Sequence, residues 1–161
     1  VVLDASALDH LPEAFTVPAL LTPHAGELAR MLGVERADVE AEPLVHARRA
    51  AERWSATVLL KGPRTLVIAP DGRVRVNLSG PPWLGTAGAG DVLAGLAGSL
   101  LATGLDPLDA GSVAAFLHGA AAVAANPGGP VTASDVAAAL PATIAHFLAG
   151  DLVDVSRGDW S

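Results

Sequence analysis

The apolar run over residues 57–61 is the feature that most limits the fold of this chain. It is nearly all apolar rather than alternating with polar residues, which is typical of a parallel strand buried on both faces of a sheet. A sheet of this kind needs a helical layer on each side, because both of its faces must be covered. The run therefore predicts a layered α/β domain.

Strand and helix patterns alternate along the rest of the chain. Further strands are expected over residues 1–4, 19–22, 65–69 and 73–77. Helices are expected over residues 27–32, 44–54, 91–102, 107–125 and 134–148. A turn signal at residues 70–72 predicts that the last two strands form a hairpin. The side chains of its second strand are expected to alternate, arginines outward and valines inward (Arg73, Val74, Arg75 and Val76).

Composition excludes several broad classes. The chain has 161 residues, enough for one domain with a core, and its net charge of -7 argues against a nucleic-acid binder or a partner of anionic membranes. It has no cysteine, so disulfides and thiolate metal sites are excluded, and a reducing cytoplasm is compatible. No membrane span is expected, since the apolar stretch 113–125 is short and contains His118. The chain begins inside a strand-like run, from which we expect earlier strands of the sheet to be missing.

A glycine-rich segment leads directly into the helix expected at residue 91. Gly85, Gly88 and Gly90 allow a tight turn that aims backbone N–H groups at one point, next to the positive end of a helix dipole. A P-loop would continue with Lys-Ser or Lys-Thr, and a dinucleotide fingerprint would follow a strand, but neither condition is met. The segment predicts an anion site with a carboxylate, Asp91, placed to accept a proton.

Two more candidate residues follow predicted strands. Lys61, the single lysine, ends the most apolar strand, where ligands of open parallel sheets bind. His24 leaves the strand over residues 19–22 and precedes Glu27 at a helix start, so it is expected in the same crevice. Glu27 fits the preference of a first helical turn for acids. His118, inside an alanine-rich helix, is expected to be a packed core residue.

Together these clusters resemble the ADP-dependent NAD(P)H-hydrate dehydratases, a family of the ribokinase-like superfamily. The resembling segments occur in the family's order and at its spacing: VLDASAL at 2–8, TPHAGE at 22–27, LKGPRT at 60–65, NLSG at 77–80, TAGAGDVLAG at 86–95 and LHG at 117–119. Several family positions are substituted here. Ala25 stands for a proline, Ser6 for an aspartate, Pro81 for an asparagine, and Ala87 and Ala89 for a glycine and a serine.

The resemblance implies a ribokinase-like three-layer α/β/α sandwich with a mostly parallel sheet and a β-hairpin. Residues 1–161 would be the C-terminal part of a longer domain whose N-terminal part is missing. The implied reaction is dehydration of (S)-NAD(P)H hydrate to NAD(P)H, a cofactor repair driven by ADP or ATP with Mg²⁺. The family also implies a cytoplasmic homo-oligomer, and an epimerase domain fused upstream in some bacterial members.

Carried over residue by residue, the resemblance makes Asp91 the catalytic base. His24 and Asp91 would contact the hydrate, and no residue is assigned as a metal ligand. The anion hole would be formed by Gly88, Ala89 and Gly90. The nucleotide would be contacted by Lys61, Gly62, Pro63, Arg64, Thr65 and Gly90. Two other functions remain open: a ribokinase-like small-molecule kinase, and a non-catalytic nucleotide-binding fragment.

Overall fold

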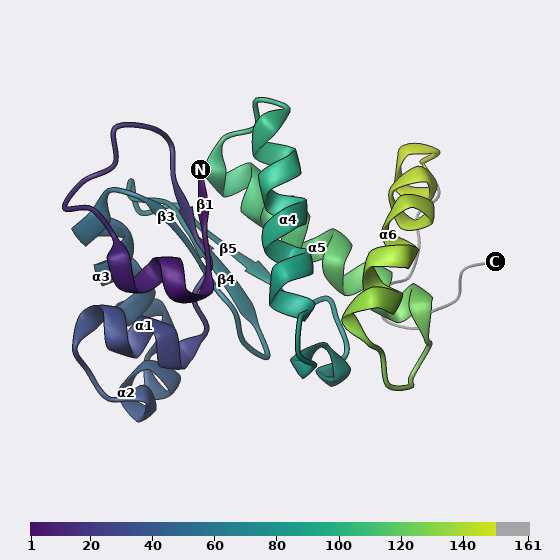
Figure 1. Ribbon diagram of the computed structural model, residues 1–161, viewed down its shortest axis with the longest axis horizontal. Coiled ribbons are helices and arrows are strands. Elements are labelled where there is room, and N and C mark those ends of the chain that lie inside the picture. Colours follow the sequence, from purple (N-terminus) through teal and green to yellow (C-terminus); the bar gives the residue numbers. More distant parts are fainter. Residues whose placement is uncertain (151–161) are drawn as a thin grey trace.

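The computed structural model describes residues 1–150, which form a five-stranded sheet with helices on both faces (Figure 1). The strands lie in the sheet in chain order: β1 (Val2–Leu3), β2 (Leu20–Leu21), β3 (Thr57–Leu60), β4 (Thr65–Ile68) and β5 (Val74–Asn77). β1, β2 and β3 pair in parallel, whereas β4 is antiparallel to both β3 and β5. The expected α/β class and the hairpin are confirmed. The end of the expected domain, residues 151–161, lies outside the described residues.

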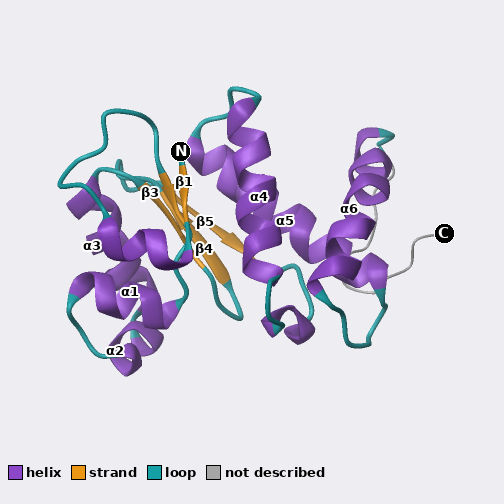
Figure 2. Ribbon diagram, viewed as in Figure 1, coloured by secondary structure: helices purple, strands orange, loops and turns teal. Residues whose placement is uncertain are grey.

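The helices form two groups separated by the sheet (Figure 2). One group follows the first strands: η1 (Ala5–His10), α1 (Ala25–Leu32), α2 (Arg36–Ala41) and α3 (Pro43–Trp54). The other follows β5: η2 (Pro82–Gly85), α4 (Ala89–Ala102), α5 (Pro107–Ala125) and α6 (Ala133–Leu148). α6 packs mainly on α5 rather than on the sheet.

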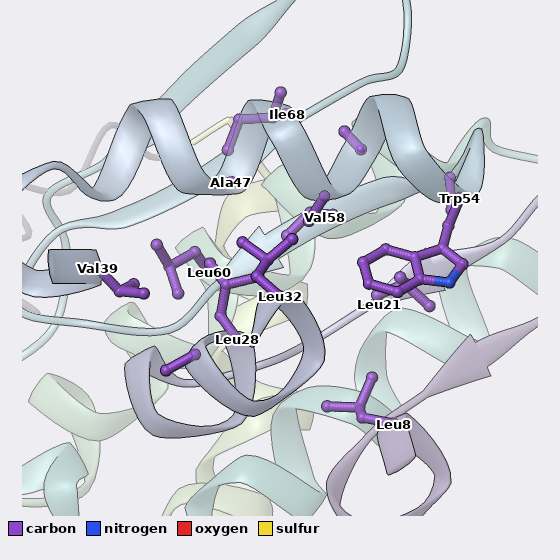
Figure 3. Close-up of a cluster of buried hydrophobic side chains, with 14 of the residues drawn as sticks. Leu8, Leu21, Leu28, Leu32, Val39, Ala47, Trp54, Val58, Leu60 and Ile68 are labelled. Carbon is purple, nitrogen blue, oxygen red and sulfur yellow. The ribbon is translucent and has the colours of Figure 1, made fainter. Parts of the chain in front are cut away.

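Alternation along the buried strands explains the three layers. Val58 and Leu60 point into a core shared with α1 and α3, which Figure 3 shows closely packed around Leu28 and Trp54. Leu59, between them in the sequence, points to the opposite face and packs with side chains of α4 and α5. Successive residues of a strand face opposite ways, so a strand with cores on both sides must be apolar throughout.

Helix boundaries follow local capping signals. Asp106 accepts a hydrogen bond from the Asp109 N–H at 2.7 Å, and Thr132 and Asp135 form a capping box at the start of α6. α1 begins two residues earlier than expected and α4 begins at Ala89. Three short helices, η1, α2 and η2, were not predicted. Each is at most six residues long, too short for an apolar period to appear.

The side chain of Val76 in β5 was predicted to point inward, but it is 55% exposed, so this prediction is wrong. Val74 packs against the core on the α1 and α3 side, but Val76, on the same face, lies at the edge of the sheet beyond that core. Arg73 and Arg75 share the other face and form ion pairs with acids at the start of α5 (Asp106 and Asp109).

α5 has the bounds expected from the sequence. An 18-residue window of this helix has a mean hydropathy of 1.4, which by length and composition alone would allow a membrane span. However, 61% of that window is buried inside the protein, where α5 packs between α4, α6 and the sheet. A central helix surrounded by protein has this composition because every face of it must be apolar.

Candidate active site

A cavity of about 490 Å³ lies at the carboxyl end of β3 and is bounded by the starts of β4 and α4 and the middle of α5. It collects most of the predicted site residues. His24, Lys61, Gly62, Pro63, Thr65, Ala89 and Gly90 line it. The position agrees with the rule that ligands of open α/β sheets bind beyond the carboxyl ends of the strands.

Lys61 lies at the centre of a partly buried ion cluster. Its Nζ donates to Oδ1 of Asp4 at 2.7 Å and lies 3.7 Å from Oε2 of Glu27. The side chains of all three residues are at most 20% exposed. Two carboxylates against one ammonium leave the cluster with one net negative charge. Solvent screens this charge less than it would at the surface.

The β2–α1 connection brings His24 to the same place. The Lys61 N–H donates to the Pro23 carbonyl at 2.8 Å, so that His24 and Lys61 form an isolated parallel bridge. His24 also caps α1. Its Nδ1 accepts from the Glu27 N–H at 3.1 Å, and the Glu27 carboxylate accepts from the His24 N–H at 2.7 Å. His24 and Lys61 thus line the same cavity, as predicted, because the segments that follow β2 and β3 pair in parallel.

The start of α4 presents free backbone donors to the cavity. Gly88 is the N-cap with φ of 83°, a left-handed conformation that favours glycine. The Ala89 N–H donates to the Thr86 carbonyl at 3.3 Å, closing the turn before the helix. Within residues 1–150, the N–H groups of Gly90 and Asp91 have no hydrogen-bond acceptor. Of the three predicted anion-hole residues, Ala89 thus has its N–H engaged within the turn, whereas those of Gly88 and Gly90 have no acceptor among the described residues.

Gly90 approaches the Lys61 cluster closely. A Cβ at this position would lie 3.4 Å from Nζ of Lys61 and 3.7 Å from Oδ2 of Asp4. The glycine loop and the end of β3 therefore form one site, although 29 residues separate them in the sequence. A ligand anion held by the Gly90 N–H would lie beside the Lys61 ammonium.

Three predicted residues lie outside the cavity lining: Arg64, Gly88 and Asp91. Asp91 is the third residue of α4, next to the lining residue Gly90, and its side chain is exposed. It therefore lies at the rim of the cavity. Arg64, in the turn between β3 and β4, is also exposed to solvent.

Asp4 and Glu27 are site residues that the sequence interpretation underrated. Asp4 directly follows β1, as Lys61 follows β3, so the strand-end rule used for Lys61 could have identified it. Glu27 was explained by the helix dipole alone, but its carboxylate is buried and faces both His24 and Lys61.

The far wall of the cavity is tied to α5 by side-chain hydrogen bonds. Asn77 Nδ2 donates to the Ala115 carbonyl at 3.1 Å, and Ser79 Oγ lies 3.3 Å from the Phe116 carbonyl. Gly119 permits the contact, because a Cβ there would lie 2.6 Å from the Ser79 carbonyl oxygen. The NLSG segment is thus held against one turn of α5.

His118 lines the cavity from the same turn of α5 and is 6% exposed, as expected of a packed residue. Burial lowers the pKa of its imidazole to about 4, and a hydrogen bond to the backbone of Ala89 acts in the opposite direction. Its Nε2 is buried without a hydrogen-bond partner. The ring is therefore neutral near pH 7.

Residues for a magnesium ion are few. Among the described residues, no group of three or more His, Cys, Asp or Glu side chains could enclose a metal ion. Mg²⁺ needs less, since it is commonly bound by one or two carboxylates together with the phosphates of its nucleotide. Asp4 and Glu27 provide two such carboxylates in a cluster of net negative charge, which fits an ion that arrives with a nucleotide.

A second hollow, of about 430 Å³, lies between η1, α1 and α3. Three of its charged residues, Asp9, Arg30 and Arg53, are already engaged. Arg30 lies 3.6 Å from Asp9, and Arg53 lies over the ring of Trp54 at 4.6 Å. It offers no free donors comparable to those at the start of α4.

Comparison with known proteins identifies the family of this chain. A family model described as NAD(P)H-hydrate dehydratase matches residues 1–142. The chain belongs to this family. Among its relatives, the chain is 41% identical over 165 residues to the ADP-dependent (S)-NAD(P)H-hydrate dehydratase of Neisseria meningitidis, covering 98% of this chain and 52% of that protein. Other relatives are named bifunctional NAD(P)H-hydrate repair enzymes.

Solved structures confirm the fold. The ADP/ATP-dependent NAD(P)H-hydrate dehydratase of Bacillus subtilis, co-crystallised with ATP/Mg²⁺, has a TM-score of 0.81 and 30% identity, covering 91% of this chain and 54% of that one. A ribokinase-like superfamily protein of Enterococcus faecalis has a TM-score of 0.73 and 26% identity, covering 91% of this chain and 52% of that one. The chain thus has the ribokinase-like fold and spans about half the length of these dehydratase-family proteins.

Proposed function

We propose that this protein dehydrates (S)-NAD(P)H hydrate to NAD(P)H at the expense of a nucleotide, with ADP as the phosphoryl donor. The observation that carries the proposal is the meeting of free N–H groups at the start of α4 with the Lys61 ammonium in one cavity. Fixed donors and a cation are what stabilise the charge of a transferring phosphoryl group. The family relationship supplies the substrate class.

Each residue has a defined task in the proposed site. The N–H groups of Gly90 and Asp91 and the ammonium of Lys61 bind the terminal phosphoryl oxygens. The residues from Lys61 to Thr65, which connect β3 to β4, contact the rest of the nucleotide. His24, 57% exposed at the mouth, contacts the hydrated ring together with Asp91. A magnesium ion carried in by the nucleotide would be held by Asp4 and Glu27 and would neutralise phosphate charge.

The proposed reaction balances in two steps. The ring hydroxyl oxygen bonds to the terminal phosphorus, the bond from that phosphorus to the bridging oxygen breaks, and Asp91 takes the hydroxyl proton. AMP leaves when ADP is the donor. The lone pair of the ring nitrogen then expels phosphate by breaking the ring C–O bond, and loss of a proton from the adjacent carbon restores the reduced ring.

The direct test is incubation of the purified protein with NADH hydrate, ADP and Mg²⁺. We expect the absorbance of the reduced nicotinamide ring to return, with one AMP and one phosphate formed per hydrate consumed. ATP in place of ADP tests the choice of donor. A protein that binds ADP but restores no NADH would support the nucleotide-binding fragment instead.

A small-molecule kinase would give a different product. It would transfer the phosphoryl group to an alcohol and leave a stable phosphate ester, whereas the dehydratase releases free phosphate. Measuring the two products with a thiazole or pyridoxal-type alcohol as acceptor separates these functions. The His24, Glu27 and Lys61 cluster favours the dehydratase, since these residues match that family's motifs.

We also propose that the protein acts in the cytoplasm as a homo-oligomer. In the described sheet β1 pairs only with β2, so its other edge carries backbone groups available for pairing. Light scattering coupled to size-exclusion chromatography tests this. A single species at the mass of one chain across a range of concentrations would contradict self-association.

A further inference from the structure

The side chain of His24 is held against the start of α1 by a reciprocal pair of hydrogen bonds. Its Nδ1 accepts from the Glu27 N–H at 3.1 Å, and the His24 N–H donates to Oε2 of Glu27 at 2.7 Å. Gly26 makes room for the ring, since a Cβ there would lie 3.1 Å from Cε1 and 3.3 Å from Nδ1 of His24. The orientation of the imidazole is therefore fixed by α1 itself.

This cap also determines which ring nitrogen carries the hydrogen. A nitrogen that accepts a hydrogen bond uses its lone pair, so the N–H of the imidazole lies on the other nitrogen, Nε2. Oε1 of Glu27 lies 3.4 Å from Nε2, and a carboxylate at this distance favours an N–H over a lone pair. Within residues 1–150, Nε2 itself makes no hydrogen bond.

Nε2 is thus the nitrogen of His24 that remains to contact a ligand. The side chain is 57% exposed and lines the cavity that also contains Lys61 and Gly90. Because Nε2 carries the hydrogen and Nδ1 is engaged, His24 can donate a hydrogen bond but has no nitrogen free to accept a proton. The ligand group beside it must therefore be a hydrogen-bond acceptor.

The hydrated nicotinamide ring offers two oxygens as acceptors, its hydroxyl and its carboxamide carbonyl. The hydroxyl oxygen attacks phosphorus in the proposed reaction, and a donor bound to it would withdraw the charge that the attack needs. The carbonyl oxygen takes no part in bond formation and can be bound throughout.

We propose that His24 donates a hydrogen bond from Nε2 to the carboxamide oxygen of the hydrated ring, and that the cap on Nδ1 prevents it from acting as the base. The ligand part of this inference rests on the proposed function. The tautomer follows from the contacts alone and can be tested without a ligand.

Long-range proton–nitrogen correlation spectra of the ¹⁵N-labelled protein test the tautomer. The signals of His24 are assigned by their absence from the spectrum of His24→Asn. We expect the pattern of a ring with its hydrogen on Nε2 at neutral pH. A hydrogen on Nδ1, alone or together with one on Nε2, would overturn the proposal.

Two amide variants separate the cap from the donor. The side-chain oxygen of Asn lies near the position of Nδ1, so His24→Asn should keep the cap, whereas His24→Gln should lose it. We expect hydrogen exchange of the Glu27 amide to be about tenfold faster in the Gln variant and close to the wild-type rate in the Asn variant. The Asp135 amide, capped by Thr132, is the internal control and should not change. The opposite ranking of the variants would contradict the cap.

Calorimetry with NADH tests the contact with the ligand, because NADH has the carboxamide and lacks the hydroxyl. The side-chain nitrogen of Gln lies near the position of Nε2, so His24→Gln should bind NADH only about twofold more weakly than the wild type. His24→Asn does not reach this position and should bind it about fivefold more weakly. Equal losses in the two variants, or no loss in either, would overturn the contact.

Turnover distinguishes a donor from a base. A Gln side chain cannot take the hydroxyl proton, so a base at this position would lose at least about a hundredfold in kcat in His24→Gln. We expect a loss of only about threefold, in line with a weakened hydrogen bond. A hundredfold loss would overturn the proposal. If the wild-type protein binds neither NADH nor ADP, the proposed function fails, and the spectra still decide the tautomer of His24.

Discussion

The net charge around Lys61 determines under which conditions the site can bind a nucleotide. Lys61 is partly buried between the carboxylates of Asp4 and Glu27, so its charge is already neutralised before a ligand enters. The cluster keeps a net negative charge and would repel a bare nucleotide phosphate. The dipole of α4 with its free donors, and a divalent cation bound by the nucleotide, offset that repulsion. Nucleotide affinity should therefore depend steeply on Mg²⁺.

The rim position of Asp91 leads to a prediction about catalysis. Asp91→Asn should reduce dehydration at least a hundredfold, in the range usual for loss of a general base. ADP affinity should change little, because the backbone N–H groups remain. Steady-state rates and calorimetry measure the two effects. The control is Asp109→Asn. It removes a carboxylate from the third residue of α5, which is the position that Asp91 has in α4, and should leave the dehydration rate unaltered. Nearly normal turnover of Asp91→Asn would exclude it as the base.

Burial of His118 predicts a pH dependence of stability. Because its pKa is lowered from 6.5 to about 4 on folding, the unfolded chain binds a proton more readily between these values. This residue's contribution is thus fully present above about pH 6.5 and is lost as the pH falls toward 4. We expect the free energy of unfolding to fall by about 2 kcal/mol from this group between pH 7 and pH 5.

Urea denaturation at the two pH values measures the effect in the wild-type protein and in His118→Asn, whose side chain does not titrate. The variant should lose less stability on acidification. Equal losses in both proteins would mean that other groups cause the acid sensitivity.

At the scale of elements, α5 acts as the platform on which the cavity is built. It packs against α4, α6, β4 and β5, and its glycines and alanines let these neighbours approach closely. Asn77 and Ser79 attach the end of β5 to it by hydrogen bonds, and His118 of the same helix lines the cavity. Small residues in a central helix therefore serve the site as well as the core.

Two glycines in helices give a matched test of this role. A Cβ at Gly119 would lie 2.6 Å from the Ser79 carbonyl oxygen, whereas nothing lies within 4 Å of one at Gly95 in α4. Gly119→Ala should lower the free energy of unfolding by about 1–3 kcal/mol through overpacking. Gly95→Ala should raise it by about 0.5–1 kcal/mol through helix propensity. Urea denaturation of both variants measures these changes in the free energy of unfolding. A Gly119→Ala variant that is more stable than the wild type would show that the NLSG segment is free to move.

For the molecule as a whole, the sheet joins two separate cores. Val58 faces the core of α1 and α3, and Leu59 faces the core of α4 and α5, with neither side chain exposed. Adjacent residues of β3 pack in different cores. A loss of packing in one core therefore disturbs the packing of the other. The site draws residues from both sides of the sheet, so it depends on this coupling.

Truncations on the two faces test that coupling. Val58→Ala and Leu59→Ala should each lower the free energy of unfolding, the leucine change by about 2–5 kcal/mol. In both variants circular dichroism and tryptophan fluorescence, to which the buried Trp54 contributes, should follow one transition. Two separated transitions in the Leu59 variant would show that the cores unfold independently.

The longer helices, the strands and part of the candidate site could be predicted from the amino-acid sequence alone. The apolar run of β3 required a sheet covered on both faces, and strand-end positions identified His24 and Lys61. The glycine segment indicated the helix start, now α4, as a candidate anion site. These features depend on local periodicity, backbone freedom and chain direction, all of which can be recognised without knowing the partners of each residue.

How those residues are used depends on the tertiary structure. The fold placed Asp4 beside Lys61, 57 residues away, turned the Ala89 N–H to Thr86, and brought His118 into the same cavity as the start of α4. It also left Val76 exposed at a sheet edge that alternation alone could not locate. Pairing between distant charges and the extent of each core depend on which segments pack together. That packing is a property of the whole chain rather than of any local pattern.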